Sequence, residues 1–243
     1  MTPLLEVRAL NKRFGAIVVA DAINLTLQSG ECLGVIGPNG AGKSSLFALI
    51  CGSVFPDSGE IWLDGRAISR LAPHKRVRLG IGRAFQIPQP FVGLTVYENV
   101  FAASRFGAGR SAREAREKAR AVLDSTGLID QANRPAGALT LLNRKRLELA
   151  KALAVEARLL MLDEIGAGLT EREVDRLVET IAALKANHAI IWIEHIAHAL
   201  KSVADRIAVL HFGAKLLEGP PDQVMGSAVV REIYMGLGVD DAA

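Results

Sequence analysis

One short glycine-rich stretch constrains this chain more than any other feature. Residues Gly37–Ser44 read Gly-Pro-Asn-Gly-Ala-Gly-Lys-Ser and match the pattern G-x-x-x-x-G-K-[ST]. An apolar run of strand length, Cys32–Ile36, precedes the stretch, and Ser45–Ile50 follows it as a helix start. A strand, a glycine turn and a helix in this order place backbone N–H groups and a helix N-terminus around an anion. The sequence therefore predicts a phosphate-binding loop, which we favour strongly over a glycine-rich surface turn.

Strand-like and helical segments alternate along much of the chain. Apolar runs of strand length occur at Leu159–Leu162, Ala189–Ile193 and Ile207–Leu210, and each alternates with a helical segment. This alternation predicts a mainly parallel sheet that is covered on both faces. Near the N-terminus, Leu4–Leu10 and Ile17–Leu27 are predicted strands around a turn at Asn11–Gly15.

The middle of the chain has a different pattern, in which helices dominate from about Pro88 to Glu156. Ser111 and Glu114 form a capping-box sequence ahead of a helix that continues to Ser125. A second helix is predicted over Arg144–Leu153 from its apolar face. We therefore expect a separate helical insert here.

Composition bounds the kind of protein. The chain has 243 residues, of which 50% are hydrophobic, and a net charge of +3 with scattered basic residues. This size permits one large domain with a full core, and the mild basicity gives no indication of nucleic-acid binding. No apolar stretch approaches the roughly 20 residues that cross a bilayer, and the N-terminus lacks a signal-peptide pattern. We expect a soluble cytoplasmic chain in which Cys32 and Cys51 are buried thiols.

Polar residues at strand ends supply the candidate chemistry. Asp163 and Glu164 end the strand Leu159–Leu162, and ligands gather at the carboxyl ends of parallel strands. Asp163 is predicted to position Mg²⁺ through water, and Glu164 to activate the attacking water as general base. His195 follows a second buried strand and suits a contact to the γ-phosphate, the alternative being a solvated loop histidine. Lys43 is predicted to reach the β- and γ-phosphates.

Together these residues resemble an ATP-binding-cassette (ABC) ATPase, the nucleotide-binding subunit of an ABC transporter. The resemblance implies an α/β P-loop NTPase (RecA-like) fold, with a mainly parallel sheet, an N-terminal antiparallel β subdomain and a helical subdomain insert. It implies one domain over 1–243, in which 1–87 and 157–243 form the nucleotide-binding core and 88–156 the helical subdomain.

The resemblance also implies the site residues, with ATP and Mg²⁺ as ligands. Catalysis is assigned to Glu164, His195, Lys43 and Gln86. Nucleotide contacts are assigned to Phe14, Gly37, Pro38, Asn39, Gly40, Ala41, Gly42, Lys43, Ser44, Ser45, Thr140 and Asn143. Contacts to Mg²⁺ are assigned to Ser44, Gln86 and Asp163.

Several segments are similar to importers of branched-chain and other hydrophobic amino acids, including Leu94–Val100, Arg144–Ala150 and Ala204–Leu210. The resemblance implies a second ATPase subunit, two membrane permease subunits and an extracytoplasmic solute-binding protein, with the chain peripheral on the inner face of the membrane. It implies that each ATP lies between one subunit's phosphate loop and the other subunit's Leu-Ser-Gly-Gly-Gln signature.

The aligned signature segment here is Leu139–Asn143, and it departs from that pattern. Thr140 keeps a hydroxyl and Asn143 keeps an amide, but Leu141 and Leu142 replace both glycines. Bulk here opposes a close approach of backbone to phosphate. Two interpretations remain: a divergent but active ATPase, or a slow or asymmetric subunit that pairs with a more regular ATPase.

Other functions stay open at this stage. The ATPase of an exporter or of a lipid-extraction complex would share all the same residues within one chain. An ABC protein acting on DNA or ribosomes would carry two cassettes or a long coiled-coil insertion, and this chain shows neither. A small kinase or GTPase is disfavoured by the acids, glutamine and histidine at strand ends.

Overall fold

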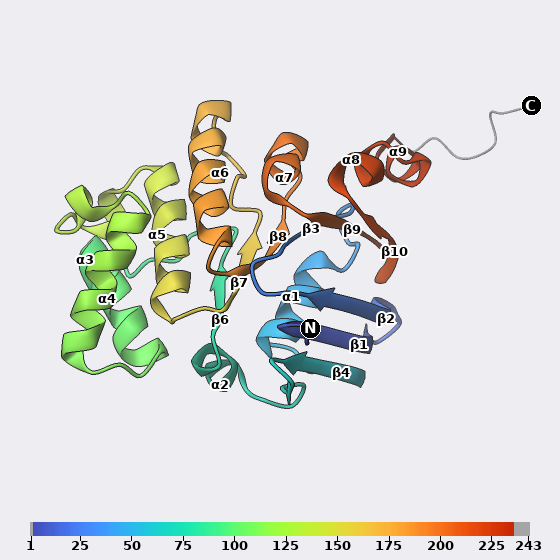
Figure 1. The fold of residues 1–243 in the computed structure, drawn as a ribbon, viewed down its shortest axis with the longest axis horizontal. Helices are drawn as coiled ribbons and strands as arrows, with labels where there is room; N and C mark the ends of the chain where they lie inside the picture. The colour runs from blue at the N-terminus through green and yellow to red at the C-terminus, as the bar shows by residue number, and fades with distance from the viewer. Residues whose placement is uncertain (1, 236–243) are drawn as a thin grey trace, which may run out of the picture. The chain divides into compact units, whose positions relative to one another are not determined.

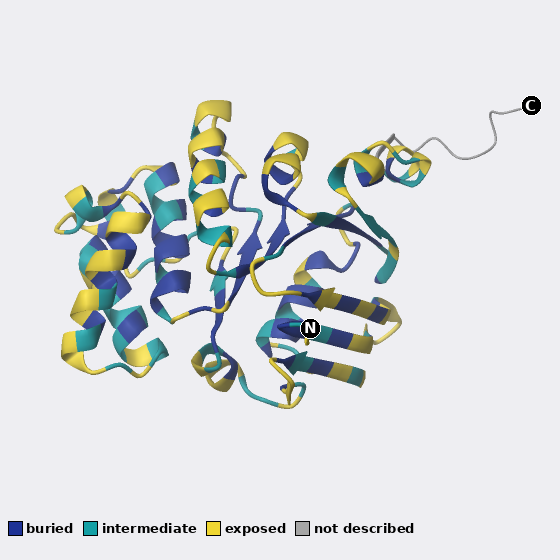
Figure 2. Cartoon of the chain, in the orientation of Figure 1, coloured by how far each residue is buried: buried dark blue, intermediate teal, exposed yellow. Residues whose placement is uncertain are grey.

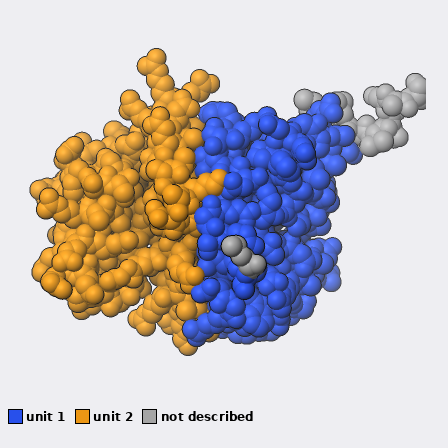
Figure 3. Space-filling view, viewed as in Figure 1, with its two compact units in different colours: residues 1–70, 191–243 blue, residues 71–190 orange. Residues whose placement is uncertain are grey.

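The computed structural model describes residues 2–235 (Figure 1). Met1 and residues 236–243 of the predicted single domain lie outside this part. Contacts divide the chain into two compact units, residues 1–70 with 191–243, and residues 71–190 (Figure 3). We call them unit 1 and unit 2. The predicted subdomain limits, 1–87 with 157–243 and 88–156, differ from the limits of these two units and stay a prediction.

Unit 1 contains an antiparallel sheet in the order β2-β1-β4-β5. β1 is the inner strand that pairs with both β2 and β4, and its inward side chains are buried. The strands span β1 Leu5–Phe14, β2 Ile17–Leu27, β4 Ser58–Leu63 and β5 Arg66–Ala67.

The predicted turn at Asn11–Gly15 is wrong, because β1 continues through Phe14. The β1–β2 register shifts between Val7 and Arg13, so bulges take up the irregular part while pairing continues. Asn11 stays within the sheet because its side chain donates to the carbonyl of Ala9 and accepts from the backbone N–H of Ala22. The hairpin turns only at residues 15–16.

Unit 1 also holds the strands that lead to the phosphate loop, in the order β10-β9-β3-β8, with residues 191–193 of β8 belonging to it. β3 pairs in parallel with β9, and β10 is antiparallel to β9. Every residue of β3 is buried, as Figure 2 shows in dark blue. The elements are β3 Cys32–Ile36, α1 Lys43–Cys51, β8 Ala189–Ile193, α7 Ala197–Val203, β9 Arg206–His211, β10 Ala214–Gly219, α8 Pro221–Met225 and α9 Ala228–Met235.

Unit 2 combines the parallel pair β6–β7 with a group of helices. The start of β8 lies beside β7 here, because the N–H of Ala189 bonds the carbonyl of Arg158. Its elements are α2 Pro73–Arg78, β6 Ile81–Ala84, α3 Val96–Ala102, a π-helical turn Ala103–Gly107, α4 Ala112–Ser125, short 3₁₀ turns Ile129–Gln131 and Ala136–Ala138, α5 Leu141–Ala154, β7 Leu159–Asp163 and α6 Glu171–Lys185.

Most predicted elements are confirmed. The capping box at Ser111 and Glu114 is formed in both directions and begins α4. The predicted helix over Arg144–Leu153 starts three residues earlier, because Thr140 caps it by accepting the N–H of Asn143. The mainly parallel strands and the separate antiparallel sheet confirm the predicted fold class. Neither Cys32 nor Cys51 is in a disulfide; Cys32 is buried as predicted, whereas Cys51 is only partly buried.

Candidate functional site

The phosphate loop joins β3 to α1 in unit 1, and two of its glycines cannot be replaced without strain. Gly37 has φ +155°, and a Cβ there would lie 2.2 Å from the carbonyl oxygen of Leu210. Gly42 has φ +100°, and a Cβ there would lie 2.5 Å from the carbonyl oxygen of Val19. Glycine is needed at both positions because left-handed backbone and close packing coincide. The loop is therefore held against its neighbours by backbone alone.

The start of α1 is suited to an anion. Gly42 occupies the N-cap position and supplies no side-chain hydrogen bond, and the first turn contains no acidic residue. Helix N-termini present N–H groups and a positive partial charge, which favour phosphate. Ser44 is exposed and Ser45 half-buried in this turn, while Asn39 and Gly40 form the exposed tip of the loop.

Lys43 lies inside the loop. Its side chain is largely buried, with 6% of the residue exposed, and its ammonium donates to the carbonyl oxygens of Gly37 at 2.6 Å and Pro38 at 3.0 Å. Ala41 is buried beside it, and its carbonyl accepts from the N–H of Gly213. A cation held at a helix N-terminus and surrounded by loop amides gives a binding site for a polyphosphate.

Two further predicted residues belong to unit 1. Phe14 ends β1 with its ring half exposed, and the ammonium of Lys12 lies 5.2 Å from the ring centroid. His195 is exposed just after β8, whereas Glu194 beside it is buried and accepts the backbone N–H of His195. Glu194 was not predicted to be a site residue; it directly follows the wholly apolar strand β8, and its own sequence position gave no indication that it is buried.

Unit 2 carries the predicted acids at the end of β7. Asp163 is buried, and its carboxylate forms an ion pair with the guanidinium of Arg83 at 2.5 Å. Arg83 lies in β6, the parallel neighbour of β7, and its guanidinium also lies 4.7 Å from the ring centroid of Phe85. Sequence reasoning missed Arg83, although its place in a strand paired with β7 brings it to the same edge.

Glu164 and Gln86 meet directly. The Nε2 of Gln86 donates to the Oε2 of Glu164 at 2.6 Å. Glu164 has φ +45°, a left-handed conformation that is uncommon for a residue with a side chain. Such strain persists where the surrounding structure fixes it, and it is frequent at functional positions. The structure thus joins the predicted base to the predicted glutamine.

The signature segment Leu139–Asn143 is also in unit 2. Thr140 caps α5, and Leu141 is 43% exposed whereas Leu142 is buried. Arg144 folds back so that its guanidinium donates to the carbonyl oxygens of Leu139 and Gly137. The exposed face of this segment therefore presents a leucine side chain where the resemblance implies glycine.

The predicted metal contacts have the right donor chemistry, since hydroxyl, amide and carboxylate oxygens are the ligands that Mg²⁺ prefers. Gln86 and Asp163 both lie in unit 2 and Ser44 lies in unit 1. Among residues 2–235, no cluster of three or more His, Cys, Asp and Glu side chains could hold a metal ion by itself.

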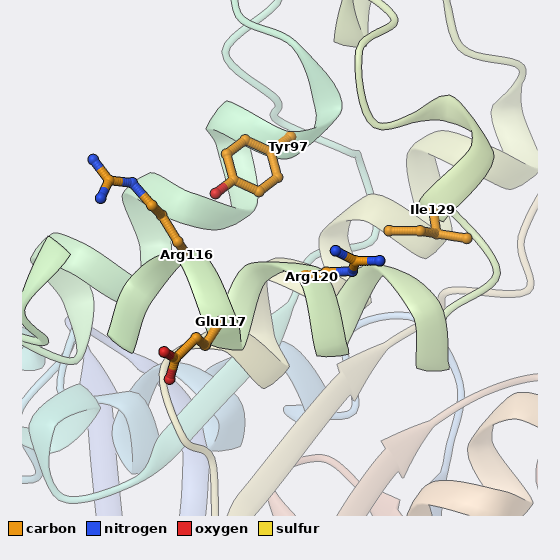
Figure 4. Close-up of a pocket in the computed structure, with 5 residues that line it drawn as sticks. All are labelled: Tyr97, Arg116, Glu117, Arg120 and Ile129. Carbon is orange, nitrogen blue, oxygen red and sulfur yellow. The ribbon is translucent and has the colours of Figure 1, made fainter. Parts of the chain in front are cut away.

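A hollow elsewhere on unit 2 is distinct from these residues. It has a volume of about 420 Å³, and Figure 4 shows its lining of Tyr97 from α3, Arg116, Glu117 and Arg120 from α4, and Ile129. None of the predicted nucleotide contacts lines it. The candidate site is therefore not this hollow.

The loop of unit 1 and the strand-end acids of unit 2 define the class of the protein: a P-loop nucleotide-binding protein. Residues 20–167 match the family model described as ABC transporter. The chain is 38% identical to the high-affinity branched-chain amino acid transport ATP-binding protein BraF of Pseudomonas aeruginosa, over 96% of this chain and 98% of the relative. It is 34% identical to the corresponding protein LivG of Escherichia coli K12, with the same coverage.

A solved structure gives the same result. The ADP conformation of MJ1267, an ATP-binding cassette of an ABC transporter, matches with a TM-score of 0.88 and 27% identity, over 98% of this chain and 100% of that one. The chain belongs to the ABC transporter family, and it is an ABC-type ATP-binding subunit and ATPase.

Proposed function

We propose that this chain is the ATP-hydrolysing subunit of an importer for branched-chain or other amino acids, or related small solutes. BraF and LivG, both named for high-affinity branched-chain amino acid transport, support this proposal through their match over nearly the whole chain. The observation that carries the catalytic part is the contact between Gln86 and Glu164 at 2.6 Å. This contact supports a pairing in which the Gln86 amide orients Glu164 and the Glu164 carboxylate accepts a proton.

In the proposed reaction the adenine stacks on Phe14, and the phosphates bind the loop from Gly37 to Ser45. Lys43 exchanges its contacts with the loop carbonyls for the β- and γ-phosphate oxygens. Glu164 removes a proton from the attacking water, and His195 donates a hydrogen bond to the γ-phosphate. Positioning and charge stabilisation supply most of the catalysis in phosphoryl transfer.

Ser44, Gln86 and Asp163 are the residues that would hold Mg²⁺. When bound, the cation neutralises charge that develops on the phosphate oxygens. Asp163 is buried and paired with Arg83, so its carboxylate is held in place before any ligand arrives.

Partners follow from the family and from one exposed surface. No helix among residues 2–235 is both long and apolar enough to cross a membrane. From the transport function for which BraF and LivG are named, we propose that two permease subunits carry the solute. Apolar side chains after β6 are exposed and suit contact with a permease; they are Phe85, Ile87, Phe91, Val92 and Leu94. A solute-binding protein outside the membrane and a peripheral place for this chain on the inner face complete the proposal.

A second ATPase subunit is also proposed, so that each nucleotide contacts a signature segment from the other chain. A solved structure of the cassette MJ0796 with ADP and phosphate is dimeric. Thr140 and Asn143 would be the contacts on this side. The exposed Leu141 favours a second candidate, in which this chain is a slow or asymmetric subunit beside a more regular ATPase.

The base is tested with Glu164→Gln in the full-length chain. ATP binding should persist while turnover falls about 10²–10⁴-fold, the range typical of a general base. Hydrolysis at the normal rate would remove Glu164 from this role.

The direction of transport is tested by deleting the gene: loss of uptake of labelled leucine supports import, whereas loss of efflux of a solute supports an exporter.

A further inference from the structure

A buried lysine on α5 contacts both ends of the Gln86–Glu164 pair through their backbone. Lys145 is 2% exposed. Its ammonium donates to the carbonyl oxygen of Gln86 at 2.6 Å and to that of Glu164 at 3.3 Å. One side chain therefore links two segments that are 78 residues apart in sequence.

Burial of this charge needs a reason. An ammonium group removed from water loses its favourable hydration, which hydrogen bonds must offset. A methionine of similar size would fill the same space without that cost. Packing of α5 alone would therefore not require a lysine at position 145. The ammonium of Lys145 is explained by the hydrogen bonds that it donates to the carbonyls of Gln86 and Glu164.

The backbone of Glu164 explains why a donor matters there. Its φ of +45° lies in the left-handed region, which is unfavourable for a residue with a side chain. The carbonyl of Glu164 accepts the N–H of Ala167 at 3.1 Å in addition to the ammonium of Lys145. These bonds oppose relaxation of a conformation that aims the carboxylate at Gln86.

α5 begins at the signature segment, and Lys145 lies in its second turn. We propose that Lys145 is a positioning residue that fixes the backbone of Gln86 and of Glu164, and so ties the catalytic carboxylate to the helix that carries the signature segment. This inference rests on the proposed roles of Glu164 and Gln86 in hydrolysis. Lys145 itself touches no reacting atom.

Lys145→Met in the full-length chain tests the proposal. The kcat for ATP should fall about 10–100-fold, because small displacements of a catalytic group have effects of that size. ATP affinity should change less than threefold, since the phosphate loop lies in unit 1. Amide hydrogen exchange should accelerate at least tenfold in peptides covering residues 84–88 and 163–167.

Lys151→Met is the matched control. Lys151 also lies on α5 and donates to a backbone carbonyl after β6, that of Gln89 at 2.8 Å, but no contact to Glu164 is among its bonds. This variant should keep kcat within threefold and leave exchange in 163–167 unchanged. If Lys145→Met does not fold, Lys145→Gln takes its place, because its shorter amide donor should loosen the same two peptides.

Two results would overturn the inference: a folded Lys145→Met with normal kcat and normal exchange, or an equal loss of kcat in Lys151→Met.

A double-mutant cycle separates positioning of Gln86 and Glu164 from a general loss of rigidity in unit 2. With Lys145→Met already present, Gln86→Ala should cost less than half of its usual loss of kcat, and full additivity would count against the proposal. Normal hydrolysis by Glu164→Gln would instead reject the proposed function on which this inference rests.

Discussion

Gln86 donates its side-chain N–H to the carboxylate of Glu164 across 2.6 Å, so two residues proposed to act in ATP hydrolysis are already in contact. The bond uses one acceptor position of the carboxylate oxygen Oε2, so no other donor can approach Oε2 from that same direction. The contact with Gln86 therefore fixes the position of one carboxylate oxygen of Glu164.

Removal of the amide should slow turnover without weakening ATP binding. Gln86→Ala is expected to lower kcat about tenfold, because Glu164 loses the group that orients it. Steady-state ATPase assays with parallel nucleotide-binding titrations measure both quantities. Gln89→Ala is the control, since Gln89 is exposed and lies on the same segment after β6. A loss of ATP affinity equal to the loss of kcat would contradict this role.

Gly42→Ala should disrupt the phosphate loop. The added Cβ would meet the carbonyl oxygen of Val19 at 2.5 Å, at a backbone φ of +100°. We expect at least a tenfold loss of ATP affinity and a loss of about 2 kcal/mol in the free energy of unfolding. Gly109→Ala is the control, because Gly109 has φ +74° with nothing within 4 Å of its Cβ. Equal losses in both variants would show that backbone strain alone is responsible.

The leucines of the signature segment are tested by restoring glycine. If the exposed Leu141 and the buried Leu142 obstruct closure over ATP, replacing both by glycine should raise the ATPase rate at least threefold. The variant should also be less stable, because Leu142 leaves a buried site. Leu216→Gly, at an exposed leucine in β10, controls for the general loss of a leucine. An unchanged or lower rate would show that the leucines belong to a working surface.

Arg83 should contribute to the free energy of unfolding, because it pairs with the buried Asp163, which is also a proposed Mg²⁺ contact. Arg83→Met leaves the buried carboxylate of Asp163 without the guanidinium at 2.5 Å, which should lower the free energy of unfolding by about 3 kcal/mol. Urea denaturation measures the change. The double variant with Asp163→Asn should recover part of it, because the unpaired charge is then removed. If the double variant lost as much free energy of unfolding as the two single variants together, Arg83 and Asp163 would not be coupled.

Apolar strands and loop glycines were predictable because their physical demands are local. β3 and β8 have the limits that their apolar runs predicted, and Gly37 and Gly42 sit where close packing excludes a side chain. The turn expected at Asn11 was not found, because bulges let a polar residue stay inside a strand.

Lys145 and Arg83 were missed for the opposite reason. Lys145 stands in the basic run Arg144–Arg146, which by itself indicates a solvated helix face. Its burial depends on a carbonyl 59 residues away. Arg83 depends on an acid 80 residues away. No local pattern contains such distances, so only the fold reveals these contacts.

The exposed ring of Phe14 has a consequence for the choice of nucleotide. An aromatic platform contacts the flat face of a base, and every base offers such a face. In the proposed binding mode, by contrast, Lys43 and the N–H groups at the start of α1 contact the charged phosphates. A site built in this proposed way would distinguish a triphosphate from a monophosphate far better than adenine from guanine. Selection of ATP would then follow from its abundance in the cell more than from recognition of the base.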